Sequence, residues 1–404
     1  MWKREVVPIE APNMVSELLI EVTEEVAAFR DSVWGIAHRE FEPRAAAADR
    51  DKAFPEHQHR VLAENGLLGI NTPEEYDGQG GTIFEVVIAL EQIAHVCVNT
   101  AMLVMTQNGA GPGWILKFGS DSQRERVLPA LAAGRELIAL CLSEPHAGSD
   151  LSAATTTAKR SGSGLVLNGR KAWVTLASRA AHFVVVARLS DAPGAEGLGL
   201  LLVPTDAGGI TIGPDEDKLG WRALPQSEVV FEDTEVGEDA VLLEAGRFKE
   251  LMTGFNEERL GNIACSVGLA QGALNSAIRY TRERQTFGAP VSDRQGVRWM
   301  LADLAVSIEA SRLLLYRAAQ NVARGNPQLV EVSMAKKLAN ETVRHATTAA
   351  VQLHGAVGFT SAYPAERMYR DGIAYGIGGG AIEIHKTMIA EQILRGRWKP
   401  TRGA

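Results

Sequence analysis

The residues best suited to chemistry begin with a glycine-rich stretch near the C-terminus. Within YRDGIAYGIGGGAIEIH (369–385), four glycines fall in five positions, namely Gly376, Gly378, Gly379 and Gly380. Glycine supplies no acid, base or ligand, but it lets backbone N–H groups approach a bound group closely. If this loop serves chemistry, the reactive side chain must therefore come from elsewhere in the chain.

A second group of polar and aromatic residues lies in the middle of the chain. The stretch LCLSEPHAGSD (140–150) is rich in hydrogen-bonding groups, and KAWVT (171–175) follows it. Alternate residues of a β-strand share one face, which places Trp173 beside Thr175. A flat ring next to a hydroxyl suits an aromatic cofactor, because the ring stacks and the hydroxyl fixes the orientation. A core tryptophan of a small β unit explains these residues almost as well, and a turn at a domain junction explains the polar stretch.

Two helical regions, one toward each end of the chain, must position these groups. Apolar residues recur every three or four positions across 13–134, for example in MVSELLIEVTEEVAAF (14–29). The same period returns from about Phe248, and the helix predicted for SMAKKLANETVRHATTAAVQLHG (333–355) should end at Gly355.

The region between them, from about Leu137 to Glu250, has a different pattern. Short apolar or alternating runs are separated by Gly, Pro, Asp or Asn, which predicts many short strands in a small β-barrel or sandwich. Asn168-Gly169 predicts a type I′ hairpin. Helices, then strands, then helices indicate an α+β protein with separate all-α and all-β domains.

The composition narrows the class of protein. The 404 residues suffice for two or three domains, and 46% apolar with 22% charged residues is ordinary for a globular protein. A net charge of −8 without a basic run argues against nucleic acid as a partner. No stretch resembles a signal peptide or a membrane span, so we expect a cytoplasmic protein that contacts no membrane.

Three weaker signals are set aside. Cys97, Cys141 and Cys265 are too scattered for a disulfide framework and are expected to be small buried side chains. HQH (57–59) has no cysteine or acidic cluster beside it, so we expect no metal site. GAGPGW (109–114) lacks the final glycine of a dinucleotide-binding loop and is predicted to precede no clear helix.

Several motifs together resemble one family. They are LSEPHAGSD (142–150), NGRKAWVT (168–175), RERQTFG (282–288), QLHGAVGF (352–359) and ERMYRD (366–371), and they stand in this order. GLLGINTPEEYDGQGG (66–81) and KLGWRALPQSEVVFEDTEV (218–236) add to them. The chain resembles the acyl-CoA dehydrogenase family over about Asn13 to Gly396.

The resemblance implies a fold and partners. It implies an α+β multidomain protein with an N-terminal helical domain (13–135), a middle β-barrel (136–247) and a C-terminal four-helix bundle (248–396). It also implies FAD between the last two domains, a homo-oligomer (dimer or tetramer) and an electron-transfer flavoprotein as oxidant.

The resemblance also implies which residues hold the flavin cofactor. Leu142 and Ser143 would line the flavin ring, Trp173 would pack near it, and the Thr175 hydroxyl would face it. Other expected FAD contacts, several of them to the FAD of a neighbouring subunit, are Arg284, Thr286, Phe287, Gln295, Gln352, His354, Gly355, Ala356, Ala381 and Glu383.

The implied reaction removes an α-proton from an acyl thioester while the β-hydride passes to the flavin. Most members carry the glutamate base at the position of Gly379, where this chain has none. A smaller set, including isovaleryl-CoA dehydrogenase, places it before an Arg-Leu pair, and GFNEERLGNIA (254–264) puts Glu258 there. We assign Glu258 as the base and the Gly379 N–H as a donor to the thioester carbonyl. Glu257 and Glu383 are the alternative bases.

The substrate contacts follow in the same way. Ser149 would touch the pantetheine arm, and Met102, Met105 and Thr106 would form the pocket floor, which favours a short or branched acyl-CoA. The further substrate-side residues are Asn256, Arg259 and Tyr375.

Three other functions stay open. The acyl group could be carried by a carrier protein in a biosynthetic pathway. The same fold also supports a flavin oxidase or monooxygenase, which does not need a carboxylate at Glu258. A non-catalytic thioester-binding module is the last alternative.

Overall fold

The computed structural model describes residues 20, 22–325, 329–396 and 398. Positions 14–19 and 21 of the first predicted helix lie outside the described residues. Its last six positions, 24–29, belong to helix α2 (Glu24–Ile36). It begins where the Thr23 hydroxyl accepts a hydrogen bond from the Val26 N–H at 3.3 Å, which satisfies one of the free donors of the first turn.

The N-terminal part is helical, as predicted. After α2 and a π-helical turn (Ala37–Phe41) come α3 (Glu42–Asp51), α4 (Glu56–Glu64), α5 (Ile83–Ala94), α6 (Val98–Asn108), α7 (Ala110–Phe118) and α8 (Asp121–Ala132). Helix α5 is almost wholly buried. Its start is fixed by a capping box, in which the Glu85 carboxylate accepts from the Thr82 N–H at 2.8 Å.

The segment GAGPGW is helical, which corrects the prediction. Gly109 caps helix α7. Pro112 lies in the first turn, where a backbone N–H has no intrahelical partner, so the ring does not interrupt the helix. Gly109 and Gly113 leave room for carboxylates of the C-terminal region, which explains the glycines without a phosphate.

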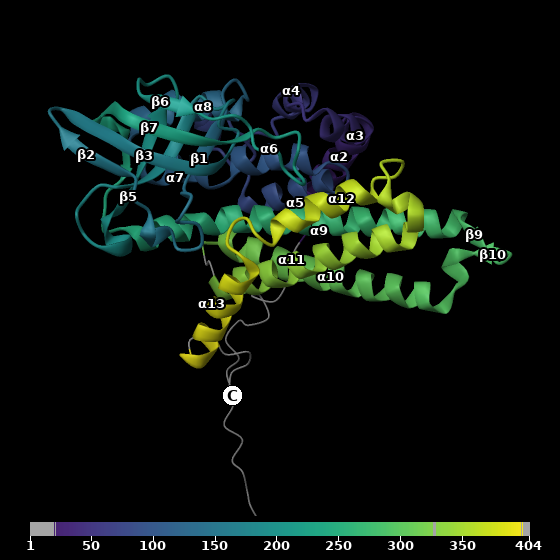
Figure 1. Cartoon of the computed structure of the whole chain (residues 1–404). Helices are drawn as coiled ribbons and strands as arrows, with labels where there is room; N and C mark the ends of the chain where they lie inside the picture. Colours follow the sequence, from purple (N-terminus) through teal and green to yellow (C-terminus); the bar gives the residue numbers. More distant parts are fainter. Residues whose placement is uncertain (1–19, 21, 326–328, 397, 399–404) are drawn as a thin grey trace, which may run out of the picture.

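The middle of the chain forms one eight-stranded sheet in the order β6-β7-β3-β2-β4-β5-β8, with β1 pairing in parallel with β4 (Figure 1). Its strands are β1 (Ile138–Cys141), β2 (Thr157–Ser161), β3 (Gly164–Thr175), β4 (His182–Arg188), β5 (Leu198–Pro204), β6 (Ile210–Ile212), β7 (Gln226–Gly237) and β8 (Val241–Leu243). The prediction of many short strands is confirmed for this region.

The hairpin predicted at Asn168-Gly169 is wrong. Strand β3 runs straight through these residues and pairs with β7 on both sides of them, with a shift of register between Leu167 and Gly169. Gly169 has φ +152°, and a Cβ there would lie 2.4 Å from the Thr156 hydroxyl oxygen. Glycine is therefore needed for the close approach of Thr156, whereas the extra residue of the bulge belongs to β7, and the hairpin turn lies earlier, where Ser161 pairs with Gly164.

Helices return at α9 (Phe248–Glu283). They continue through a small hairpin, β9 (Gln285–Thr286) and β10 (Ala289–Pro290), and then α10 (Gln295–Ala323), α11 (Leu329–His354), α12 (Ala365–Tyr375) and α13 (Ile382–Leu394). Helix α11 ends before Gly355, whose φ is +64°, and this confirms the predicted stop. The β9–β10 hairpin lies at the end of α9 that points away from the sheet (Figure 1).

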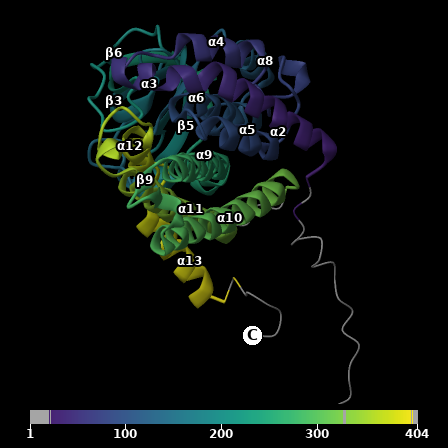
Figure 2. The same cartoon turned by 90° about the vertical axis from the view of Figure 1, so that its right-hand side faces the viewer.

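Helix α9 is the central element of the molecule. Figure 2 shows it end-on, between the N-terminal helices and the pair α10 and α11. Gly268 and Gly272 face α5 so closely that a Cβ on either would lie 2.2 Å from a backbone oxygen, of Glu91 or His95 respectively. These two glycines allow the N-terminal helices to pack directly on α9.

Two smaller predictions concern side chains. All three cysteines are buried and unpaired, as expected. Within the described ranges, no helix is both long enough and apolar enough to cross a membrane.

Candidate active site

A cavity of about 650 Å³ opens where the N-terminal helices, the sheet and the C-terminal helices meet. Its walls come from α6, β1, β3, α9, α12 and the glycine loop that precedes α13. The structure brings together the following predicted residues along these walls: Met102, Met105, Thr106, Leu142, Ser143, Ser149, Trp173, Thr175, Glu258, Gly379 and Ala381.

Glu258 lies on α9 and presents its carboxylate to the cavity. One carboxylate oxygen accepts a hydrogen bond from the Ala110 N–H, at the start of α7, at 3.3 Å. A Cβ on Gly109 would lie only 2.3 Å from the same oxygen, so position 109 has no room for a side chain. Burial raises the pKa of Glu258 to about 7, although the Ala110 N–H and the charge of Lys336 act to lower it.

Glu257 differs from its neighbour in place and surroundings. It is absent from the cavity wall and lies against α7, where a Cβ on Gly113 would approach its carboxylate to 3.0 Å. Burial raises its pKa to about 6, and Lys117 opposes this shift. Successive helix residues point about 100° apart, which explains why only Glu258 lines the cavity.

The glycine loop forms the wall next to Glu258. Gly379 and Gly380 have φ values of +68° and +97°, which glycine adopts without strain. Among the residues that the structure describes, no group accepts a hydrogen bond from the Gly379 N–H. The loop therefore offers a backbone donor without a protein partner at the edge of the cavity.

The loop is held from behind by Lys336, a residue that the sequence analysis missed. Lys336 is fully buried on α11, and its ammonium donates to the carbonyl of Gly378 at 3.0 Å and to the side-chain oxygen of Asn262 at 2.8 Å. Burial, followed by the charge of Arg259, lowers the pKa of Lys336 to about 7, and Glu258 acts to raise it. The surrounding oxygen acceptors favour the charged ammonium, because it has three N–H donors.

The opposite part of the site is carried by β3. Trp173 is 59% exposed and has φ +61°, an unusual conformation for a bulky residue. The Thr175 hydroxyl accepts a hydrogen bond from Gln226 at 3.2 Å, and the same amide donates to the Trp173 carbonyl at 3.2 Å. The open tryptophan is not a core residue, which removes one alternative left by the sequence.

A buried ion pair fixes the loop that carries Leu142 and Ser143. Lys171 of β3 donates to Glu144 at 2.8 Å and to the Leu142 carbonyl at 3.1 Å, and both charged side chains are fully buried. Burial acts to raise the pKa of Glu144, but the Lys171 ammonium and the hydrogen bonds from Thr155 and Thr156 together lower that pKa to about 2. Glu144, the glutamate of LSEPHAGSD, thus has a structural role.

Several predicted cofactor residues lie away from the cavity of this chain. Arg284, Thr286 and Phe287 lie in or beside the β9–β10 hairpin, and the Phe287 side chain is 98% exposed. Others outside the cavity wall are Gln295 at the start of α10, Gln352, Gly355 and Ala356 around the end of α11, and Glu383 on α13, all exposed.

Four further predicted residues are buried without lining the cavity, and one of them, His354, lies far from it, at Ser276, about 27 Å along α9 from Glu258. His354 stacks on Tyr280 with ring centroids 4.6 Å apart, and its ring nitrogens lie 2.7 Å from the Ala350 carbonyl and 3.2 Å from the Ser276 hydroxyl. The other three are Asn256, which accepts from Arg259 at 2.9 Å, Arg259 itself, and Tyr375, which packs against Trp221. None of the four is part of the cavity wall.

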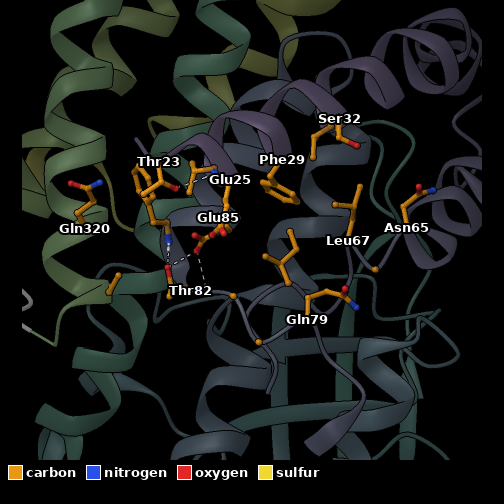
Figure 3. Close-up of a pocket in the computed structure, with 18 of the residues that line it drawn as sticks. Thr23, Glu25, Phe29, Ser32, Asn65, Leu67, Gln79, Thr82, Glu85 and Gln320 are labelled. Carbon is orange, nitrogen blue, oxygen red and sulfur yellow. Dashed lines mark hydrogen bonds between the residues drawn. The ribbon is translucent and has the colours of Figure 1, made fainter. Parts of the chain in front are cut away.

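A second groove, of about 780 Å³, shares no lining residue with this cavity. Figure 3 shows its side chains, which come from α2, the loop before α5 and the end of α10. Its two carboxylates serve helix starts, because Glu85 caps α5 and Glu25 lies in the first turn of α2. The groove therefore lacks the combination of acid and open N–H donor found beside Glu258.

Family models match nearly the whole chain. The acyl-CoA dehydrogenase N-terminal domain matches residues 23–135, the middle domain matches 139–234 and the C-terminal domain matches 248–394. The mitochondrial short-chain specific acyl-CoA dehydrogenase of Mus musculus is 37% identical over 377 residues, which are 93% of this chain and 92% of that protein.

Solved structures are similar over the same span. Butyryl-CoA dehydrogenase from Megasphaera elsdenii has a TM-score of 0.89 at 29% identity, covering 93% of this chain and 99% of the other. The prolyl acyl carrier protein oxidase AnaB has a TM-score of 0.88 at 28% identity, covering 92% of this chain and 100% of the other.

Proposed function

The chain belongs to the acyl-CoA dehydrogenase family of flavoprotein oxidoreductases, and from this membership we propose that Glu258 is its catalytic base and the Gly379 N–H its carbonyl donor. The reaction is the α,β-dehydrogenation of an acyl thioester to the 2-enoyl thioester. One observation carries the assignment: Glu258 is the single carboxylate among the described residues that line the cavity, and Gly379 lines the same cavity.

The carboxylate is suited to the first step. A base works best when its pKa is near the working pH, and burial places that of Glu258 at about 7. The α-carbon loses its proton to a Glu258 oxygen, and negative charge develops on the thioester oxygen. The Gly379 N–H, which has no acceptor among the described residues, stabilises that charge.

The residues around the cavity also fit FAD. Trp173 presents an exposed indole beside the Thr175 hydroxyl, and the loop of Leu142 and Ser143 is held rigid by the buried Lys171 ion pair. These side chains would hold the flavin, with Ala381 at its edge. Bound there, FAD supplies the acceptor for the hydride that leaves the β-carbon.

The exposed β9–β10 hairpin supports a homo-oligomer. The Phe287 side chain is 98% exposed, so a second copy of the chain would find a large aromatic surface there to bury. We assign Arg284, Thr286, Phe287, Gln295, Gln352, Gly355 and Ala356 to contacts with FAD bound in a neighbouring copy. His354 would support that surface from inside the chain. The oxidant we propose is an electron-transfer flavoprotein.

The acyl pocket favours a short or branched chain. Met102 and Met105 of α6 form its apolar floor, with Thr106 beside them, and Ser149 lies exposed for contact with a pantetheine arm. The glutamate placement resembles that of isovaleryl-CoA dehydrogenase. We also propose domain limits of 13–135, 136–247 and 248–396. The middle domain would be a closed barrel, the last domain a four-helix bundle, and the location of the protein cytoplasmic.

Anaerobic titration of the purified flavoprotein with a panel of acyl-CoA thioesters tests the function. We expect at least one short or branched thioester to bleach the flavin. Glu258→Gln should keep its FAD and lose at least about 100-fold in bleaching rate. Glu257→Gln is the matched control and should stay within a few-fold of the wild-type rate. Loss of bleaching in Glu257→Gln alone would falsify the assignment of the base.

The second candidate is oxidation of an acyl group on a carrier protein, and the similarity to AnaB favours it. A comparison of the same acyl group on CoA and on a carrier protein separates the two. Reoxidation of the reduced flavin by O2 tests a further alternative, because an oxidase reacts rapidly and a dehydrogenase slowly. A colourless protein would support a thioester-binding module.

A further inference from the structure

Lys336 has surroundings that a lysine rarely occupies. Its side chain is 0% exposed, yet four oxygen atoms lie within reach of the ammonium. They belong to Asn262 at 2.8 Å, Asn340 at 3.0 Å, Gly378 at 3.0 Å and Tyr375 at 3.4 Å. A buried ammonium is costly unless such acceptors compensate for the lost water, so the arrangement must be maintained by the whole site.

The four acceptors connect the two halves of the reaction centre. The Tyr375 carbonyl belongs to the residue before the glycine loop, and the Gly378 carbonyl belongs to the peptide unit that also carries the Gly379 N–H. Asn262 lies one helical turn after Glu258 on α9, and its amide also donates to the Gly378 carbonyl at 3.3 Å. Lys336 thus joins the helix of the base to the loop of the carbonyl donor.

We propose that Lys336 is a positioning residue for the dehydrogenation: its ammonium fixes the glycine loop so that the Gly379 N–H meets the thioester oxygen. The inference rests on the function proposed above. Rotation of the Gly378–Gly379 peptide would move the Gly378 carbonyl and the Gly379 N–H together, because they belong to one planar unit. A donor that holds this carbonyl therefore sets the direction of that N–H.

The charge of Lys336 has a second effect, on the base. Lys336 faces Glu258 and Arg259 of α9 and His385 of α13, and His385 is uncharged because burial lowers its pKa to about 3. Around Glu258, the other groups are the Ala110 N–H of α7 and Glu257 of its own helix. The positive charge of Lys336 thus stabilises the ionised form of Glu258.

The test uses the FAD-loaded protein with Lys336→Met and Lys336→Gln. Lys337→Met is the matched control, since Lys337 is the next residue and pairs with Glu341 at the surface at 2.7 Å. Two quantities are measured: the rate of flavin reduction against pH, and the infrared carbonyl stretch of a bound, unreactive thioester labelled with carbon-13. If the Met variant does not fold, the Gln variant decides, because it keeps a polar donor without the charge.

We expect both Lys336 variants to reduce flavin about 100-fold more slowly at pH 7, the typical effect of a misplaced group. The carbonyl stretch should move toward that of the free thioester, and the rise of rate with pH should shift to higher pH. Lys337→Met should change neither. An unchanged stretch and pH profile in Lys336→Gln would overturn this inference alone. A wild-type protein that no thioester reduces would overturn the proposed function as well.

Discussion

The carboxylate of Glu258 and the N–H of Ala110 lie 148 positions apart in the chain and form a hydrogen bond of 3.3 Å. Glu258 belongs to α9 of the C-terminal region, whereas Ala110 begins α7 of the N-terminal region. The start of a helix carries partial positive charge and free N–H groups, so it orients and stabilises a carboxylate. The N-terminal region thus sets the direction of a carboxylate, the proposed base, that is carried by the C-terminal region.

Gly109→Ala should damage the reaction without loss of fold. The added Cβ would lie 2.3 Å from the Glu258 carboxylate and 2.6 Å from the Met105 carbonyl, so the base must move. We expect a loss of about 100-fold in the rate of flavin reduction, with FAD still bound. Gly113→Ala is the control, because its Cβ would meet only the flexible end of Glu257. Stopped-flow measurement of both variants checks this, and equal rates would contradict it.

The buried carboxylate of Glu258 should lower the free energy of unfolding at alkaline pH. Its pKa is about 4.5 when unfolded and about 7 when folded, so the folded state holds the extra proton between these values and loses stability as pH rises through them. Glu258→Gln should therefore be more stable than the wild type at pH 8, by up to about 3 kcal/mol, and gain little at pH 4. Urea unfolding at both pH values measures this. The control is Glu75→Gln, because Glu75 is exposed, and its effect on stability should not differ between the two pH values.

The acyl chain length that the protein prefers should depend on the packing of Met105 against Gly261. A Cβ on Gly261 would lie 2.7 Å from the Met105 side chain. Met105→Ala should enlarge the pocket and move the optimum of kcat/KM to longer chains, because each methylene is worth roughly 1–3 kcal/mol in a fitted pocket. Gly261→Ala should push Met105 into the cavity and favour shorter chains. A panel of straight-chain thioesters tests both, and shifts in the same direction would disprove the relationship.

The Lys171 ion pair should be important for stability. Lys171→Met leaves Glu144 charged and buried, which costs about 3–5 kcal/mol, and it frees the Leu142 carbonyl. Thermal unfolding should shift downward, with FAD released at a lower temperature. Arg170→Met on the same strand is the control, since its pair with Glu228 is largely exposed and is worth at most about 1 kcal/mol. Similar losses from the two variants would show that burial of the pair is unimportant.

Local sequence signals predicted the elements well and their connections less well. The periodicity of α11 and its stop at Gly355 were readable, because both depend on nearby residues. Asn168-Gly169 has the residues of a hairpin turn, yet β3 continues through it and pairs with β7 on both sides. The glycines of GAGPGW make sense only when the carboxylates of α9 are present. In both places tertiary contacts decide the meaning of a local motif.

The residues of the candidate site divide in the same way, into those that a local sequence pattern predicts and those that only tertiary contacts reveal. Glu258 was located by its place before Arg259 and Leu260, and the cavity indeed contains it. Lys336 could not be found in this way. The helical period places Lys336 nearer than Lys337 to the apolar face of α11, but it does not reveal the contact with Asn262, which joins residues 74 positions apart. A polar residue of this kind is recognised only after α11 is packed on α9.

Helix α9 has 36 residues and spans about 54 Å, with Glu258 near its start and the β9–β10 hairpin just beyond its end. Deleting a single residue between Arg259 and Glu283 would preserve the helix but swing the hairpin by about 100° around the axis relative to the carboxylate. The number of residues in this segment is therefore constrained as strictly as their identity. Insertions and deletions should be tolerated in the surface loops long before they are tolerated here.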